Sequence, residues 1–114
     1  MKIVLKRWKL MMSKIYKDSK GISYEVGDIV RNPLMGDFWV VQTCSDEEKE
    51  MYGLETDICL ALNNDKDDYA IDIDAPAGFE IVIRPSDEHY AEAIAELQQI
   101  TEQRKGWLTD EQDN

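Results

Sequence analysis

Residues 38–44, FWVVQTC, decide the fold. Five of these seven side chains are aromatic or β-branched, which is the composition of a strand in the middle of a sheet. Asn32-Pro33 and the turn residues Met35-Gly36-Asp37 separate this strand from an earlier one. Directly after it, Ser45-Asp46-Glu47-Glu48 has the form of a capping box and predicts a short helix that Gly53 ends.

Five further strands are expected on either side of this one. Residues 2–11 suit an exposed edge strand, and Gly21 supplies the positive φ of a tight reversal before a strand in residues 24–31. Residues 68–74 alternate most clearly between apolar and acidic side chains. The side chains expected to share a face are Val26, Asp28 and Val30; Ile58, Leu60 and Leu62; Tyr69, Ile71 and Ile73; and Phe79, Ile81 and Ile83.

After Pro85 the apolar period changes from that of a strand to that of a helix. Ser86 is a good N-cap, and Gly106 is a good C-cap glycine. Trp107 and Leu108 would then fold back onto the sheet, and residues 109–114 would form a flexible acidic tail. One stripe at helical spacing contains Tyr90, Ile94, Leu97, Ile100 and Thr101.

The order of elements, strands first and a long helix last, predicts an α+β domain. We expect a small, strongly bent antiparallel β-sheet or an SH3-like barrel, with the C-terminal helix packed on it. A chain of 114 residues is one domain of ordinary size. We place that single globular domain at residues 1–108.

Positively and negatively charged residues are distributed unevenly along the chain. Residues 1–20 carry seven Lys or Arg and one acid, whereas residues 21–114 carry six Lys or Arg and 23 acids. The net charge is −11. A surface this acidic repels nucleic acids and membranes, so we expect neither as a direct partner.

The start of the chain does not have the pattern of a signal peptide, because lysines interrupt its apolar residues. No run approaches the length of a membrane span. The sequence therefore predicts a cytoplasmic protein. In that compartment Cys44 and Cys59 are expected to be reduced, buried thiols.

Two patterns resemble chemical sites, and each has a plainer interpretation. Asn63, Asp65, Asp67 and Asp74 fall at positions one, three, five and twelve of a calcium loop, but Asp68 stands where glycine is needed. A solvated hairpin turn fits better. Asp72 and Asp74 share a strand face as an acid–base pair does, yet no pocket is predicted nearby. We expect no enzyme activity, no metal site and no cofactor.

The acidic run from Asp46 to Asp74 contains eleven acids and two lysines. The plain interpretation is a solvated face that keeps the protein soluble. The functional interpretation is a docking surface for a protein with a basic surface, with carboxylates spaced like phosphates. The residues expected to form this partner-binding surface are Asp65, Asp67, Asp68, Asp72, Asp74, Glu47 and Glu48.

The stretch KIYKDSKGISYEVGDIVRNPLMGDFWVVQ resembles the YopX-like proteins of phages and prophages. The basic opening Lys6-Arg7-Trp8 is similar to the start of that family, and Gly-Asp-Ile-Val also recurs at the first strand of SH3-like barrels. The resemblance covers residues 1–42 and implies a phage-type origin and a small barrel-like fold, without catalytic residues. The matching residues are Lys17, Asp18, Gly21, Tyr24, Gly27, Asp28, Ile29, Val30 and Trp39.

These observations support three hypotheses of function. The first is a non-catalytic, acidic phage-type protein that blocks a nucleic-acid-binding host or defence protein, as anti-CRISPR or anti-restriction inhibitors do, in the cytoplasm of a bacterial host cell. The second is a sponge that binds a small ligand or signalling nucleotide against Trp8, Trp39 and Tyr69. The third is an intracellular adaptor of mobile-element origin. The sequence leaves the oligomeric state open.

Overall fold

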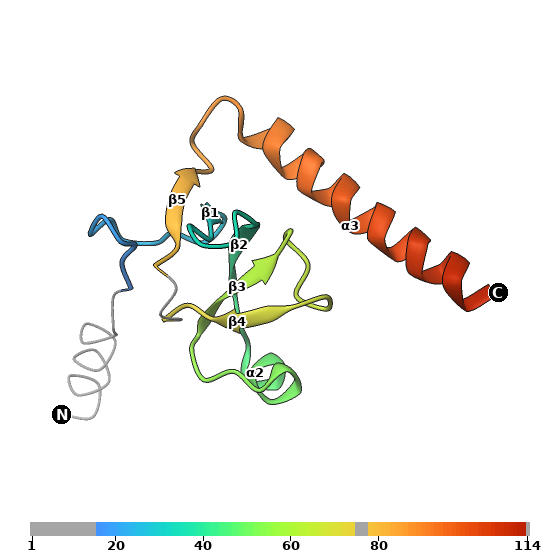
Figure 1. The fold of residues 1–114 in the computed structure, drawn as a ribbon. Coiled ribbons are helices and arrows are strands. Elements are labelled where there is room, and N and C mark those ends of the chain that lie inside the picture. Colours follow the sequence, from blue (N-terminus) through green and yellow to red (C-terminus); the bar gives the residue numbers. More distant parts are fainter. Residues whose placement is uncertain (1–15, 75–77, 114) are drawn as a thin grey trace.

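A computed structural model describes residues 16–74 and 78–113 of the chain, with side chains as far as Lys105. It contains a five-stranded antiparallel sheet and a long C-terminal helix, which confirms the predicted α+β class (Figure 1). The sheet is open, with order β4-β3-β2-β1-β5, and is not a closed barrel. The elements are β1 (Ile29–Arg31), β2 (Phe38–Thr43), α2 (Asp46–Tyr52), β3 (Ile58–Leu62), β4 (Ala70–Asp72), β5 (Glu80–Ile83) and α3 (Tyr90–Asp113).

β2 is the central strand, as its composition predicted. Its neighbour β3 is buried at its three middle residues, so both of its faces are covered. The predicted capping box is present, because Ser45 accepts from the Glu48 amide and Glu48 accepts from the Ser45 amide. Gly53 ends α2 with a φ of 70°.

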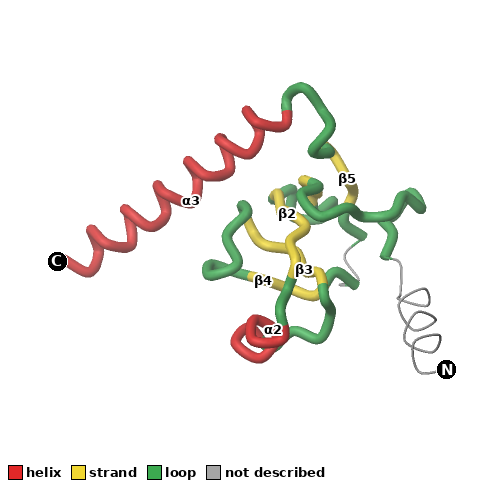
Figure 2. The backbone as a smooth tube through the Cα atoms, turned by 180° about the vertical axis from the view of Figure 1, so that it is seen from behind, coloured by secondary structure: helices red, strands yellow, loops and turns green. Residues whose placement is uncertain are grey.

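The two faces of the sheet bury different sets of apolar side chains. On one face the core is a cluster that includes Trp39 and Phe79, whose rings meet edge to face at 5.7 Å between centroids. On the other face Leu97 of α3 packs with Ile29 and Val40. Figure 2 shows α3 as a long helix that begins beyond β5 and runs past β2 and β4. The first cluster contains Val30, Trp39, Val41, Leu60, Ile73 and Phe79, and the second contains Ile29, Val40 and Leu97.

The predicted strand in residues 24–31 is shorter than expected. Residues 26 and 27 form a turn, in which Gly27 has a φ of 99°. Val26 is therefore exposed while Asp28 and Val30 are fully buried, so the shared face predicted for these three residues is wrong. A side chain at position 27 would lie 2.8 Å from Pro85 Cγ, so glycine lets this turn pack closely on the segment that leads into α3.

The prediction that Phe79, Ile81 and Ile83 share one face of the sheet is also wrong. Phe79 and Ile81 pack with the Trp39 cluster, but Ile83 packs with the Leu97 cluster. The pairing of β1 with β5 shifts register between Ile29 and Val30, and such a bulge breaks the alternation of side chains. The predicted strand at 68–74 is likewise only three residues long.

Both predicted ends of the long helix are wrong. α3 begins at Tyr90, and the Asp87 side chain, not that of Ser86, accepts the hydrogen bond from the His89 amide, at 2.8 Å. The helix continues through Gly106 and ends at Asp113, so Trp107 and Leu108 are part of it. The division into a domain at 1–108 and a flexible tail at 109–114 stays a prediction. The predicted edge strand at 2–11 lies outside the described residues.

Candidate protein-interaction surface

The short helix α2 lies beside the turn that joins β3 to β4. The Tyr52 hydroxyl donates a hydrogen bond to Asp67, and Lys66 forms an ion pair with Glu48. The capping box and this ion pair together hold the pKa of Glu48 below its ordinary value, with the Lys66 contact as the largest cause. The fold thus brings two acidic segments together, as the partner-binding prediction requires.

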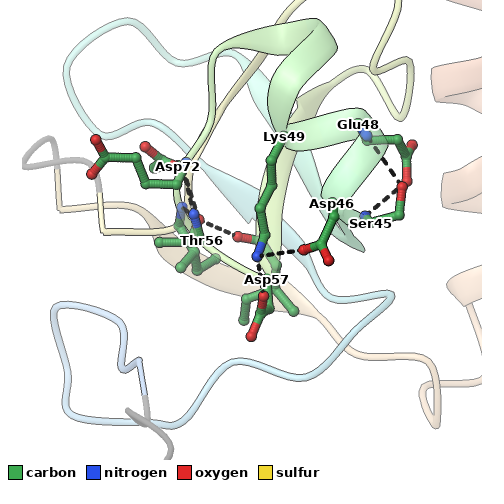
Figure 3. Close-up of polar contacts among 10 residues, drawn as sticks. Ser45, Asp46, Glu48, Lys49, Thr56, Asp57 and Asp72 are labelled. Atoms are coloured by element: carbon green, nitrogen blue, oxygen red, sulfur yellow. Dashed lines mark hydrogen bonds and ion pairs between the residues drawn. The ribbon is translucent and has the colours of Figure 1, made fainter.

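Lys49 is the second lysine of this region, and it is already engaged. Its ammonium group pairs with Asp46 at 3.4 Å and with Asp57 (Figure 3). The contact with Asp57, followed by that with Asp46, raises the pKa of Lys49, whereas burial acts in the opposite direction. Both carboxylates stay open to solvent, because the side chains of Asp46 and Asp57 are 100% and 89% exposed.

Asp72 does not point outward, so that part of the prediction is wrong. Its Oδ1 accepts hydrogen bonds from the Glu55 amide at 2.9 Å, the Thr56 amide at 3.0 Å and the Thr56 hydroxyl at 2.8 Å (Figure 3). Burial raises the pKa of Asp72, but these three donors outweigh it and leave the pKa below its ordinary value. Asp72 therefore holds the loop before β3 against β4.

Asp65 and Asp68 are also engaged within the chain. Arg104 of α3 pairs with Asp68 at 2.9 Å, and Lys105 pairs with Asp65 at 3.4 Å. The side chain of Asp68 is only 28% exposed and that of Asp65 only 13%. They join the β3–β4 turn to α3, and their charges are largely compensated by the chain's own cations.

The acids that stay accessible form a different set from the one that the sequence predicted. Of the predicted residues, Glu47, Asp67, Asp68 and Asp74 are exposed, and Asp68 is set apart from the other three by its ion pair with Arg104. Exposed acids on α2 and on the loop that follows it join them. We use the name acidic surface for Asp46, Glu47, Glu50, Glu55, Asp57, Asp67 and Asp74. Residue spacing alone did not separate these from Asp65, Asp68 and Asp72, because the partners of those three come from distant segments.

A polar groove runs between the β3–β4 turn and α3, with a volume of about 180 Å³. Its cations, Arg104 and Lys105, already face Asp68 and Asp65, which leaves little positive charge for a nucleotide phosphate. Trp39 is buried in the core and contacts Tyr69 edge to face at 5.8 Å. Two of the three aromatic side chains proposed for a ligand sponge thus serve packing, and the third, Trp8, lies outside the described residues.

Within residues 16–74 and 78–105, whose side chains the structure describes, His, Cys, Asp and Glu nowhere gather in a group of three or more that could hold a metal ion. The same part of the chain has no helix with the length and apolar character needed to cross a membrane. No protein-family model, curated protein or solved structure matches this chain. The resemblance of residues 1–42 to YopX-like proteins therefore stays a prediction.

Proposed function

We propose that this protein is a non-catalytic, acidic binding protein that docks on the basic surface of a nucleic-acid-binding protein and blocks it. The observation that supports the proposal is the acidic surface itself. Between Asp46 and Asp74 the chain has eleven acids and two lysines, and both lysines are paired with acids of the chain. Of the seven exposed carboxylates, Asp46 and Asp57 share Lys49 and Asp67 accepts from Tyr52. The other four form no ion pair with a described residue and are available to cations of a partner: Glu47, Glu50, Glu55 and Asp74.

Electrostatic complementarity of this kind acts first on association. A dense acidic surface raises the rate of encounter with a basic partner, and added salt screens the attraction over about 8–10 Å. Neutralising exposed acids should therefore slow association far more than it speeds dissociation. The resemblance of residues 1–42 to phage proteins is the reason to expect a host or defence protein as the partner.

The test compares two triple variants with equal changes of charge. The first, Glu47→Gln, Glu50→Gln and Asp74→Asn, lies on the acidic surface. The control, Glu88→Gln, Glu92→Gln and Glu102→Gln, changes exposed acids in or just before α3. Glu88 and Glu92 lie at the start of α3, at the opposite end of the molecule from α2, and Glu102 lies about three turns further along that helix (Figure 1). The baits are the wild-type protein and both variants, each used to capture proteins from a bacterial lysate at low and high salt.

The proposal requires three results together. The wild type and the control variant retain the same basic protein at low salt, the acidic-surface variant loses it, and high salt releases it from all three baits. The purified partner must also lose its binding to nucleic acid when the wild-type protein is added. Equal loss in both variants would mean that total charge, and not this surface, attracts the partner. Retention by all three baits at high salt would contradict the proposal.

A further inference from the structure

The turn between β1 and β2 exposes two large apolar side chains side by side. Leu34 is 82% exposed and Met35 is 79% exposed, more than any other large apolar residue among those described. Contiguous exposed apolar surface is where proteins bind partners, whereas single scattered apolar side chains are ordinary. We call Leu34 and Met35 the apolar tip.

Hydrogen bonds hold the backbone of the apolar tip in one conformation. The Asn32 side-chain oxygen accepts from the Leu34 amide at 2.9 Å and from the Met35 amide at 3.3 Å. The Gly36 amide donates to the Asn32 carbonyl at 2.8 Å, and the Asn32 amide donates to the Asp37 carbonyl at 2.9 Å. Because the tip is ordered in advance, binding through it costs little conformational entropy.

A shallow apolar groove lies next to the tip, between α3 and the sheet. Its volume is about 110 Å³, and it is lined by Ile29, Phe38, Val82, Ile83 and Leu97, with Glu96 among the lining residues. Phe38 and Val82 are 39% and 43% exposed. A cavity of about 150 Å³ holds a benzene molecule, so this groove has room for one aliphatic side chain.

We infer that the occupant of this groove is the apolar tip of a second copy of the chain. Phe38 lines the groove and is three residues from Met35, so the tip and the groove belong to one continuous surface. A surface that carries both a knob and its hole is self-complementary and pairs about a two-fold axis, with each copy inserting its tip into the groove of the other.

The charges beside the two features are also complementary. Arg31 is exposed, and its guanidinium group reaches the tip at Gly36, 3.8 Å from the place of a Cβ there. Among the described residues no acid forms an ion pair with Arg31, and Glu96 is an exposed acid at the groove. The exchange of tips therefore brings the Arg31 of each copy toward the Glu96 of its partner.

Net charge works against this dimer, which gives it a characteristic response to salt. Each copy carries −11, so two copies repel one another at low ionic strength. Salt screens that long-range repulsion while leaving the burial of apolar side chains in place. Self-association through the tip should strengthen with salt, whereas docking on the acidic surface should weaken. The two responses have opposite signs, so either proposal can fail without the other.

The experiment is sedimentation analysis of the full chain over a range of concentrations at low and high salt. The wild type should show a weak, concentration-dependent dimer that is stronger at high salt. Leu34→Ser with Met35→Ser, and separately Val82→Glu, should each weaken the dimer at least about tenfold. Met51→Ser is the matched control, since Met51 is 71% exposed on α2, and it should leave the dimer unchanged. Val82→Thr, with a thermal melt, replaces Val82→Glu should that variant unfold.

Mixing the tip variant, Leu34→Ser with Met35→Ser, with the groove variant, Val82→Glu, gives the decisive test. The tip variant keeps an intact groove, and the groove variant keeps an intact tip, so a mixture of the two should form a heterodimer with one exchange restored. A monomer at every concentration would overturn the inference, as would an equal effect of Met51→Ser. Weakening by the tip variant alone, with Val82→Glu and Val82→Thr both without effect, would show that two tips meet each other and would overturn the role of the groove.

Discussion

The hydroxyl of Thr56 donates a hydrogen bond to Oδ1 of Asp72 at 2.8 Å and lies close enough to accept from the Ile73 amide at 3.4 Å. Thr56 is only 7% exposed, and the same aspartate oxygen also accepts from the Thr56 and Glu55 amides. This pair ties the loop before β3 to the end of β4 across 16 residues of sequence. Asp72 is therefore a structural residue, although the sequence placed it on the solvent side.

Asp72→Ala should lower the free energy of unfolding by about 1–3 kcal/mol, because it leaves the Glu55 and Thr56 amides without their acceptor, whereas the Thr56 hydroxyl can still donate to the Ile58 carbonyl at 2.6 Å. Asp72→Asn should cost less, since its amide oxygen can still accept. Asp74→Ala is the matched control, and as an exposed change it should stay within about 0.5 kcal/mol. Chemical denaturation at neutral pH measures all three. Equal stability of the two alanine variants would show that the Thr56 contact contributes nothing.

Gly27→Ala should destabilise the protein by about 2–4 kcal/mol, through a left-handed φ and a collision with Pro85. The φ at Gly27 is 99°, and the added Cβ would lie 2.8 Å from Pro85 Cγ and 3.1 Å from the Tyr90 hydroxyl. Gly21→Ala separates the two causes, because Gly21 has a φ of 82° and nothing within 4 Å. That control should cost only about 1–2 kcal/mol. Equal melting temperatures for Gly27→Ala and Gly21→Ala would exclude the close packing of Gly27 on Pro85 as a cause of the destabilisation.

Leu97→Ala should cost about 2–4 kcal/mol, the range for a buried leucine. Leu97 is 5% exposed and belongs to the cluster with Ile29 and Val40, so its removal opens a cavity between α3 and the sheet. Ile100→Ala, at a position that is 41% exposed, should cost much less. An unchanged melting temperature for Leu97→Ala would mean that α3 is detached from the sheet.

The sequence predicted those parts of the fold that depend on local pattern. The central strand at Phe38–Thr43, the capping box at Ser45 and the strand at Ile58–Leu62 all follow from composition and short spacing. The α+β class follows from the order of these elements. Each is confirmed because the residues that decide it lie within a few positions of one another.

The predictions that failed concern residues whose contacts are made with partners far along the chain. Gly27 forms a turn that packs against Pro85, so alternation from Val26 to Val30 does not describe a strand. The register shift beside Ile29 moves Ile83 to the other face of the sheet. Asp65, Asp68 and Asp72 matched the pattern of a solvated face, but their partners lie 16 to 40 residues away. No local period carries that information.

Both cysteines should resist alkylation in the folded protein and react fully after unfolding. Cys44 and Cys59 are buried and are not joined by a disulfide, as predicted. Burial raises the pKa of Cys59 to about 11 and raises that of Cys44, so little thiolate exists near neutral pH. Thiol counting with and without denaturant, on unreduced protein, should find two thiols after unfolding and almost none before it. Rapid labelling of the native protein would show that this end of the sheet opens readily.

Asp28 should affect stability with the opposite pH dependence to Asp72. Asp28 is fully buried, and burial raises its pKa above the ordinary value, although the Glu25 amide at 2.7 Å and Arg84 at 3.8 Å act against this. A raised folded-state pKa means that the native protein binds the proton more tightly than the unfolded chain does. Ionised Asp28 therefore costs stability at neutral pH, and the cost disappears as the pH falls through its folded-state pKa.

Asp28→Asn removes this titration, so the stability of the variant relative to wild type should decrease as the pH is lowered from 7 toward 4. For Asp72→Asn the sign reverses. The depressed pKa of Asp72 means that its ionised form stabilises the native state at every pH above the unfolded value of 3.8. This stabilisation is lost as the pH falls from 3.8 through the lower folded-state pKa, so the destabilisation caused by Asp72→Asn should shrink in acid. Urea denaturation of the wild type and both variants from pH 7 to about pH 2 measures the two slopes, that of Asp28→Asn above about pH 4 and that of Asp72→Asn below it. Parallel slopes, or a relative stability of Asp28→Asn that rises in acid, would show that Asp28 is ionised at little cost and that Arg84 and the Glu25 amide compensate its burial.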